Sequence, residues 1–545
     1  MKIVVTSFII AVAAELFRLV ATRRGSETPQ ARLAKMATWL MRPIAAVCAV
    51  NLTLRLSGTI YHGMNLATYP FYANEWKPES ESAMDAIRTA MSSDGILPWL
   101  PVSLALCSLG VFAAFCVARL RPPPEGRGDD ARMRPACSAR RVAALIVAPV
   151  LTAALAFSTM VSVCSLPNGM FTGEGQRSSL LRPWHDAGTT MLYAIPAMFP
   201  KVKHYWRHFH KFQHGLTIHA RSHPPVASSF VRWIGKCFGV KVTDPMSYRD
   251  AHARLRYALG QSFFSSLNVI LVFAIGLAMF NYRTGLFAAL LYAVAPSFVS
   301  YGTFAPDMNY ALFFHGAILF TWLVATESRP GRALLFCLPL GLCYSMLNVM
   351  TFSWCIMTTI SAAFITLASL KLHRSWREIA LRVIPPMLLM VLFTGSFLLY
   401  YHIDYLAIYK NSSEYVYGFY HKDSFLLKAL ALVGGQVEWL SLLGPLTCSG
   451  MFLFLFRPLL ARGDNNYGMQ RLYLIVLLEV FLIPVLLGPA CLKHEVARCW
   501  IWMAAVPVVC SASHWLEKAS PRACASVFAS SALAAVALRL FVRII

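Results

Sequence analysis

Residues 201–223 carry cationic, histidine and aromatic side chains of the kind that bind anions. Segment 201–214 reads KVKHYWRHFHKFQH, and helical periodicity places its tyrosine and phenylalanines on one face. Lys201 and Lys203, with other basic residues, cover much of the remaining surface. Such a helix either anchors a chain at a membrane surface or holds a lipid-linked phosphate. Both interpretations stay open.

The histidines of this stretch could suggest a metal site, because histidines four residues apart on a helix can bind a transition metal. They all fall in one loop, with no HxxHH box and no nearby carboxylate to complete a ligand set. The sequence therefore predicts no metal site, and it leaves open whether a divalent cation assists a reaction. The six histidines are His204, His208, His210, His214, His219 and His223.

Acidic side chains that could act as a base are few near these cations. Asp186 lies in the run RPWHDAG, where it could accept a proton or cap a helix over 189–198. Glu174 is the rival candidate for the base. Asp307 and Glu495 lie at ends of apolar segments, where a carboxylate is costly unless it is used or paired. Each is therefore expected either to bind an acceptor substrate or to form a structural ion pair.

The composition determines which class of protein must position these residues. Apolar residues make up 57% of the 545 residues and charged residues 14%, against about 45–50% and 25% in soluble domains. Soluble and disordered proteins are excluded, and an all-α polytopic membrane protein is predicted. The net charge of +24 is attributed to membrane orientation, so no nucleic-acid partner is expected. The 14 cysteines form no CxxC pair, which argues against a disulfide framework.

About 12–14 membrane-spanning helices are predicted, because a span needs about 20 apolar residues. If the spans alternate, the short Lys/Arg-rich loops all fall on one side, the cytoplasmic one. The long loop 165–256 then faces outward, although it holds eleven Lys/Arg between 201 and 256. An anionic partner at the outer surface explains this charge. The candidate spans are residues 3–22, 37–57, 96–118, 142–164, 257–280, 284–302, 309–326, 333–349, 351–370, 379–400, 428–456, 472–490, 499–516 and 523–542.

Several short motifs share an order along the chain. His223-Pro224-Pro225 follows the long outer loop and precedes an amphipathic stretch. With the motifs below, it resembles the GT-C membrane glycosyltransferases, relatives of protein O-mannosyltransferases (glycosyltransferase family 39) and of the lipid A aminoarabinose transferase. The resemblance covers about residues 142–516. The further motifs are Ala295-Pro296, Pro306-Asp307, the aromatic run Tyr409–Tyr420, Gly444-Pro445 and the segment Lys493–Trp500.

The resemblance implies a GT-C-like fold with a large extracytoplasmic first core loop. Residues 1–141 would add N-terminal spans to a core over 142–516, and 517–545 would add a C-terminal span. It implies transfer of a sugar from a polyprenyl-phosphate donor to an acceptor outside the cell (inner) membrane. The sugar stays open, as does the nature of the acceptor, which is a glycan, a lipid or a protein. Alternative functions are a lipid-glycan ligase or flippase, or a secondary transporter.

In the family, a carboxylate in the first core loop acts as base, and Asp186 matches its position, although no second acid adjoins it as the family pattern requires. Cations stabilise the leaving phosphate, because arginine and lysine clamp phosphate oxygens. Asp307 and Glu495 would bind the acceptor or serve the structure. No cofactor is implied, and membrane lipids are the remaining partners. The residues expected to bind the donor phosphate are Arg221, His223, Arg498, Lys201 and Lys203.

Overall fold

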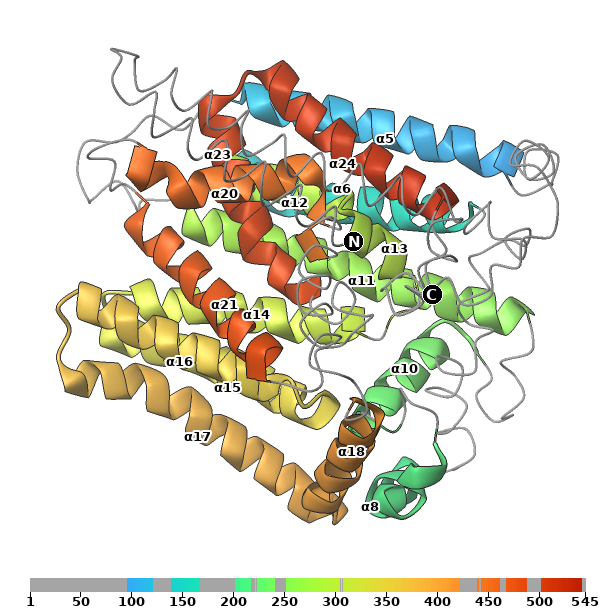
Figure 1. The fold of residues 1–545 in the computed structure, drawn as a ribbon, viewed down its shortest axis with the longest axis vertical. Helices are drawn as coiled ribbons and strands as arrows, with labels where there is room; N and C mark the ends of the chain where they lie inside the picture. Colours follow the sequence, from blue (N-terminus) through green and yellow to red (C-terminus); the bar gives the residue numbers. More distant parts are fainter. Residues whose placement is uncertain are drawn as a thin grey trace, which may run out of the picture.

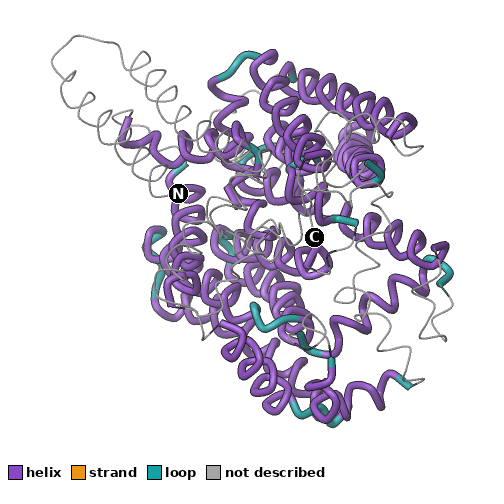
Figure 2. Tube along the Cα trace, turned by 45° about the vertical axis from the view of Figure 1, so that its right-hand side comes forward, coloured by secondary structure: helices purple, strands orange, loops and turns teal. Residues whose placement is uncertain are grey.

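The structure, a computed structural model, describes residues 96–120, 139–166, 201–216, 221, 223–240, 251–303, 305, 307–420, 439–440, 443–460, 467–487 and 501–541. Across these ranges the regular structure is helical, with no strand (Figure 2). Within the described ranges, seven helices are long and apolar enough to cross a membrane. The predicted class of all-α polytopic membrane protein is confirmed. The first two candidate spans, 3–22 and 37–57, lie outside the described residues.

The long helices follow the predicted spans closely, and shorter helices lie between and after them (Figure 1). The seven long ones are α5 (Ile96–Arg119), α6 (Ala139–Cys164), α11 (Ala251–Met279), α14 (Asp307–Thr326), α15 (Pro330–Met350), α16 (Trp354–Lys371) and α17 (Trp376–Tyr401). The others are α8 (Val202–Phe212), η3 (Gln213–Gly215), α10 (Pro225–Cys237), α12 (Tyr282–Ala293), α13 (Pro296–Tyr301), α18 (Tyr405–Tyr420), α20 (Pro445–Leu460), α21 (Gly468–Leu487), η5 (Ile501–Ala504), α23 (Ala505–Lys518) and α24 (Pro521–Phe541).

The single span predicted over 284–302 is wrong, because the segment is divided into α12 and α13. Pro296 opens α13, and Ala295 before it has an extended backbone, with φ −58° and ψ 129°. A residue before proline is driven out of the helical region, so the helix ends there. The 12 residues of α12 reach about 18 Å, less than the roughly 30 Å of membrane hydrocarbon. Residues 284–293 are all buried, so α12 is enclosed by protein.

Two glycines let α11 and α12 pack backbone against backbone. A Cβ on Gly276 would lie 2.6 Å from the Cα of Gly285. A Cβ on Gly285 would lie 2.6 Å from the carbonyl oxygen of Phe273 and 2.9 Å from the amide nitrogen of Leu277. Small residues of this kind are typical of close helix contacts in membranes. The α11–α12 hairpin therefore depends on the absence of side chains at this crossing.

One end of the helix bundle gathers helix ends that flank the predicted cytoplasmic loops. Arg283 at the start of α12 donates hydrogen bonds to the carbonyl oxygens of Val117 and Ala118 at the end of α5. Gln470 of α21 donates to the carbonyl oxygen of Met279 at the end of α11, at 2.7 Å. These contacts join helix ends that the predicted alternation of spans puts on the same, cytoplasmic side of the membrane.

Two arginines close the last turn of α14 at this same end. Arg374 donates to the carbonyl oxygens of Ala325 and Glu327, at 2.5 and 2.7 Å. Arg382, only 2% exposed, donates to the carbonyl oxygen of Val324. The last carbonyls of a helix have no partner within it, and its dipole favours cations there. This accounts for an arginine buried among apolar helices.

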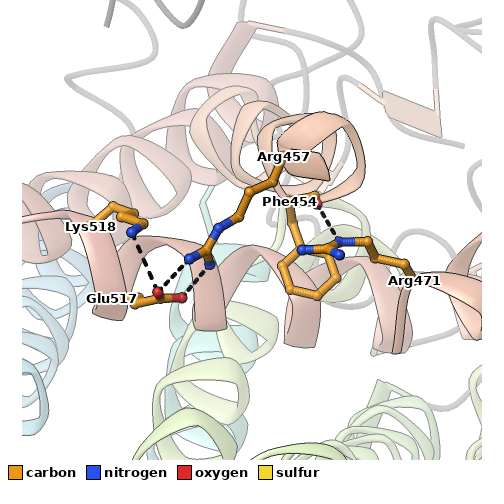
Figure 3. Close-up of polar contacts among 5 residues, drawn as sticks. All are labelled: Phe454, Arg457, Arg471, Glu517 and Lys518. Carbon is orange, nitrogen blue, oxygen red and sulfur yellow. Dashed lines mark hydrogen bonds and ion pairs between the residues drawn. The ribbon is translucent and has the colours of Figure 1, made fainter. Parts of the chain in front are cut away.

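A salt bridge ties α20 to α23, also at this end (Figure 3). The Arg457 guanidinium makes two hydrogen bonds to the Glu517 carboxylate, of 2.5 and 2.7 Å, and Lys518 lies 3.4 Å from it. Burial acts to raise the pKa of Glu517, but the hydrogen bonds and charge of Arg457 hold it below its usual value. Next to this pair, Arg471 of α21 donates to the carbonyl oxygen of Phe454 at 3.4 Å. Polar contacts therefore hold these three helices together.

The opposite end carries α8, α10 and α18, which lie together at the lower right of Figure 1. α8 and α10 belong to the loop 165–256, and α18 to the loop 401–427, both predicted to be extracytoplasmic. On the other side of the molecule, α24 runs beside α5, so the C-terminal and an N-terminal helix pack together (Figure 1). The division into a core and added spans remains a prediction.

We expect an impermeant maleimide added to intact cells to label Gly215→Cys but not Gly331→Cys. Both glycines are exposed, and a Cβ at either would meet no atom within 4 Å. They lie at opposite ends of the bundle, so they form a matched pair. The exposed cysteines of the described residues, Cys116, Cys237 and Cys355, are first replaced by serine. The reverse pattern of labelling would overturn the predicted orientation.

Candidate functional site

The amphipathic helix predicted over 201–214 forms as α8 and η3, but its apolar face does not meet lipid. Tyr205 and Phe209 are 0% exposed and pack with Ile408 of α18. The Tyr205 hydroxyl and that of Ser228 in α10 are hydrogen bonded at 3.0 Å. A surface anchor needs its apolar side chains free to enter the bilayer. The interpretation of α8 as a membrane anchor is therefore wrong for this face.

Gln213 ties the end of α8 to α18 and to the segment that follows. This side chain is fully buried, and its amide nitrogen donates to the carbonyl oxygens of Arg221 and Ile408, at 2.8 and 3.2 Å. It also donates to the Ser412 hydroxyl at 2.8 Å. The Ser412 hydroxyl in turn donates to the carbonyl oxygen of Arg221 at 2.9 Å. A buried amide with its bonds satisfied fixes the backbone just before the His-Pro-Pro turn.

The His-Pro-Pro turn has the geometry predicted for it. Pro224 is extended, with φ −60° and ψ 155°, and Pro225 is the first residue of α10. Proline suits this position because the first amides of a helix have no intrahelical partner. His223 therefore stands outside the helix, at a rigid corner between α8 and α10.

His223 lies against the start of α14. Its ring centroid is 5.3 Å from that of Tyr310, with the rings inclined at 52°. Tyr310 comes three residues after Asp307, so both lie on one face of α14. Asp307 is in the first turn of the helix and is 6% exposed. The structure thus brings the turn that carries His223 to the helix face that carries Asp307.

The position of Asp307 at a helix start is favourable by itself, because the helix dipole stabilises a negative charge there. The segment before it is held by a buried amide pair: Gln261 of α11 and Asn309 exchange two hydrogen bonds of 3.0 Å. Gln261 also donates to the carbonyl oxygen of Ala305, and Ser265 to that of Gly302 at 2.7 Å. These bonds fix the start of α14, whether Asp307 binds an acceptor or serves the structure.

The other predicted phosphate ligands that the structure describes differ in their contacts. The Arg221 guanidinium donates to the carbonyl oxygen of His214 at 3.3 Å and lies 3.0 Å from its Nδ1. The Nζ of Lys203 lies 5.0 Å from the centre of the Tyr400 ring, a cation–π contact at the end of α17. Lys201 is exposed at the start of α8. No convergence of these cations on one point is visible in the described residues.

A packed contact in the middle of α14 holds η5 in place. Phe314 stacks on Trp502 with centroids 4.0 Å apart and planes at 7°. The Nε2 of His315 is 3.1 Å from the carbonyl oxygen of Trp502, and both residues are buried. His315 is thus a hydrogen-bonded residue packed inside α14. The contact also anchors the chain directly after the segment that contains Arg498.

Part of the predicted site lies outside the described residues. Within the described ranges, no group of three or more histidine, cysteine, aspartate or glutamate side chains could hold a metal ion. The remaining predicted site residues lie outside the described residues: Asp186, its rival Glu174, Glu495 and Arg498.

Sequence reasoning did not single out three residues that build this region. Tyr310 could have been found from its spacing of three from Asp307 on a helix. Arg232 of α10 is 7% exposed, and a helical wheel of residues 225–237 places it on the buried face with Ser228. No sequence pattern marks Gln213 as important, because only the fold brings α18 next to it.

No protein-family model matches the sequence, and no curated protein sequence matches it. A structural match is the oligosaccharyltransferase complex with zinc and sulfate of Archaeoglobus fulgidus, at 12% identity and a TM-score of 0.40. It covers 72% of this chain, and the chain spans about half of that protein, 53% of its length. A likeness this loose carries no conclusion about function.

Proposed function

We propose that this chain is a membrane glycosyltransferase that moves a sugar from a polyprenyl-phosphate donor to an acceptor at the extracytoplasmic surface. The observation that carries the proposal is the contact of His223 with the face of α14 that bears Asp307. It joins two motifs of the resemblance that lie far apart in the sequence. A buried carboxylate and a histidine at one end of a helix bundle suit chemistry at the membrane boundary.

The reaction needs three functions from the protein. A base accepts the proton of the acceptor hydroxyl while the hydroxyl oxygen forms a bond to the sugar, and Asp186 is proposed for this role. Cations stabilise the phosphate as its bond to the sugar breaks, a role proposed for His223, Arg221 and Arg498. Asp307 is proposed to hold the acceptor through a hydrogen bond from one of its hydroxyls. The proton moves from the acceptor to the base, and polyprenyl phosphate leaves.

The first test is whether the purified chain in lipid nanodiscs releases polyprenyl phosphate from a panel of polyprenyl-phosphate sugars. We expect release that depends on an added acceptor extract. Transport of a solute across vesicles containing the chain, without any such release, would favour the secondary transporter instead.

Asp307→Asn is expected to raise the KM for the acceptor about tenfold with a smaller change in kcat, because the acceptor hydroxyl then donates to a neutral amide instead of a charged carboxylate. Asp404→Asn is the matched control: Asp404 is an exposed aspartate at the same end, at the start of α18. Steady-state kinetics of both variants decide the role. If Asp307→Asn leaves the KM unchanged but lowers thermal stability, Asp307 is a structural residue.

A further inference from the structure

One half of α8, whose side chains are exposed or half-buried, is a continuous cationic face. On a helix with 3.6 residues per turn, its basic and histidine residues occupy one half of the circumference. The other half holds the aromatic and aliphatic residues that pack against α10, α17 and α18. We call the first half the cationic face of α8; its residues are Lys201, Lys203, His204, Arg207, His208, His210, Lys211 and His214.

The charge of this face is not neutralised by the neighbouring helix. Among the described residues, no lysine or arginine of α8 forms an ion pair with an acid. Glu414 of α18 lies 3.9 Å from Lys410, and Asp404 accepts a hydrogen bond from the amide of Ala407. Partial desolvation and then the neighbouring cationic residues lower the pKa of His208, as expected where cations are crowded.

The length of the cationic face matters as much as its positive charge. From Lys201 to Lys211 the helix rises about 15 Å, and four permanent cations lie along this distance. A single phosphate is only a few ångströms wide and would meet one or two of them. A linear chain with a regular series of negative groups can meet them all. The face therefore suits an extended anion.

We propose that the cationic face of α8 binds an anionic carbohydrate chain that carries carboxylate or phosphate groups. Its role as the acceptor of the transferase rests on the proposed function, whereas the binding itself does not. The face ends at η3, whose first residue, Gln213, donates a hydrogen bond to the carbonyl oxygen of Arg221, two residues before His223. A chain lying along it would present its sugars near the His-Pro-Pro turn.

An anionic lipid surface is a poorer partner for this face. Helices that bind membranes combine cations with apolar side chains that enter the bilayer. The apolar residues of α8 are turned into the protein, with Tyr205 and Phe209 fully buried. In the part of the chain that the structure describes, the edge at Lys203 touches an exposed aromatic residue, Tyr400 at the end of α17. The rest of the face offers charge and hydrogen-bond donors alone, as a water-borne polyanion requires.

The test measures binding of fluorescent polygalacturonate to the full chain in nanodiscs of phosphatidylcholine, with uncharged dextran as the probe control. We expect binding of polygalacturonate that weakens with salt, and none of dextran. Arg207→Gln with Lys211→Gln should raise the Kd about tenfold, because two contacts between a cation and the anionic chain are lost. The matched control is Arg329→Gln with Lys371→Gln, which removes the same charge from exposed sites at the opposite end.

Three results would overturn the proposal. Equal weakening by both double variants would mean that only net charge matters. Polygalacturonate binding no stronger than dextran binding would exclude an anionic chain. Binding by the wild type to phosphatidylglycerol vesicles alone, lost in the α8 variant, would assign the face to lipid headgroups. The outcome is separate from the proposed function. If the protein binds polygalacturonate but releases no polyprenyl phosphate, this inference stands and the proposed transferase function is rejected.

Discussion

Asp186→Asn is expected to lower the rate of sugar transfer by about 10²–10⁴-fold, the usual contribution of a positioned base. Asparagine keeps the size of the side chain and can still cap a helix, so folding should survive. It cannot accept the proton of the acceptor hydroxyl. The measurement is kcat for release of polyprenyl phosphate, together with the amount of monodisperse protein as a check on folding.

Glu174→Gln is the companion variant, because Glu174 is the other acid considered for the same role. It removes one carboxylate charge from the same loop and should change kcat little. If Asp186→Asn stays nearly active while Glu174→Gln collapses, the base is Glu174 and Asp186 is a helix cap. Full activity of both variants would show that neither Asp186 nor Glu174 is the base.

Gly285→Ala is expected to destabilise the fold by about 1–3 kcal/mol, the usual cost of overpacking. The new Cβ would lie 2.6 Å from the carbonyl oxygen of Phe273 and 2.9 Å from the amide nitrogen of Leu277. Both are backbone atoms, so α11 and α12 must separate to make room. Size-exclusion chromatography after heating in detergent measures the loss of folded protein.

Gly395→Ala is the matched control, because Gly395 lies inside α17 and a Cβ there meets no atom within 4 Å. Alanine favours a helix over glycine by about 1 kcal/mol at either site, so the control should be neutral or more stable. Any difference between the two variants then measures the α11–α12 crossing. Equal stability of the two would mean that the hairpin tolerates a wider spacing.

The sequence was sufficient for features governed by local rules. The amphipathic helix at 201–214 and the helix start at Pro225 follow from periodicity and from proline chemistry, and both are present. The break at Pro296 carried a signal too, since a residue before proline leaves the helical region. The prediction of one span over 284–302 weighed hydropathy above that signal and was wrong.

Features that depend on long-range contacts could not be predicted in the same way. Periodicity identified the apolar face of α8 but not its partners, and α10, α17 and α18 cover it rather than lipid. The approach of His223 to Tyr310 joins residues 87 positions apart, which no local pattern encodes. Asp186 and Arg498 remain predictions from the family resemblance, because they lie outside the described residues.

The enclosure of α12 has a consequence for biogenesis. Its partners α5, α6 and α11 are synthesised before it, but α23 follows after the ribosome has moved on from residue 282 to residue 505. At about 5–20 residues per second, that interval lasts roughly 10–45 s. A helix too short to span the bilayer cannot wait alone in lipid, so the hairpin with α11 must hold it until α23 is inserted. Defects at Gly276 or Gly285 should therefore appear first as degradation of newly made chains by membrane quality control.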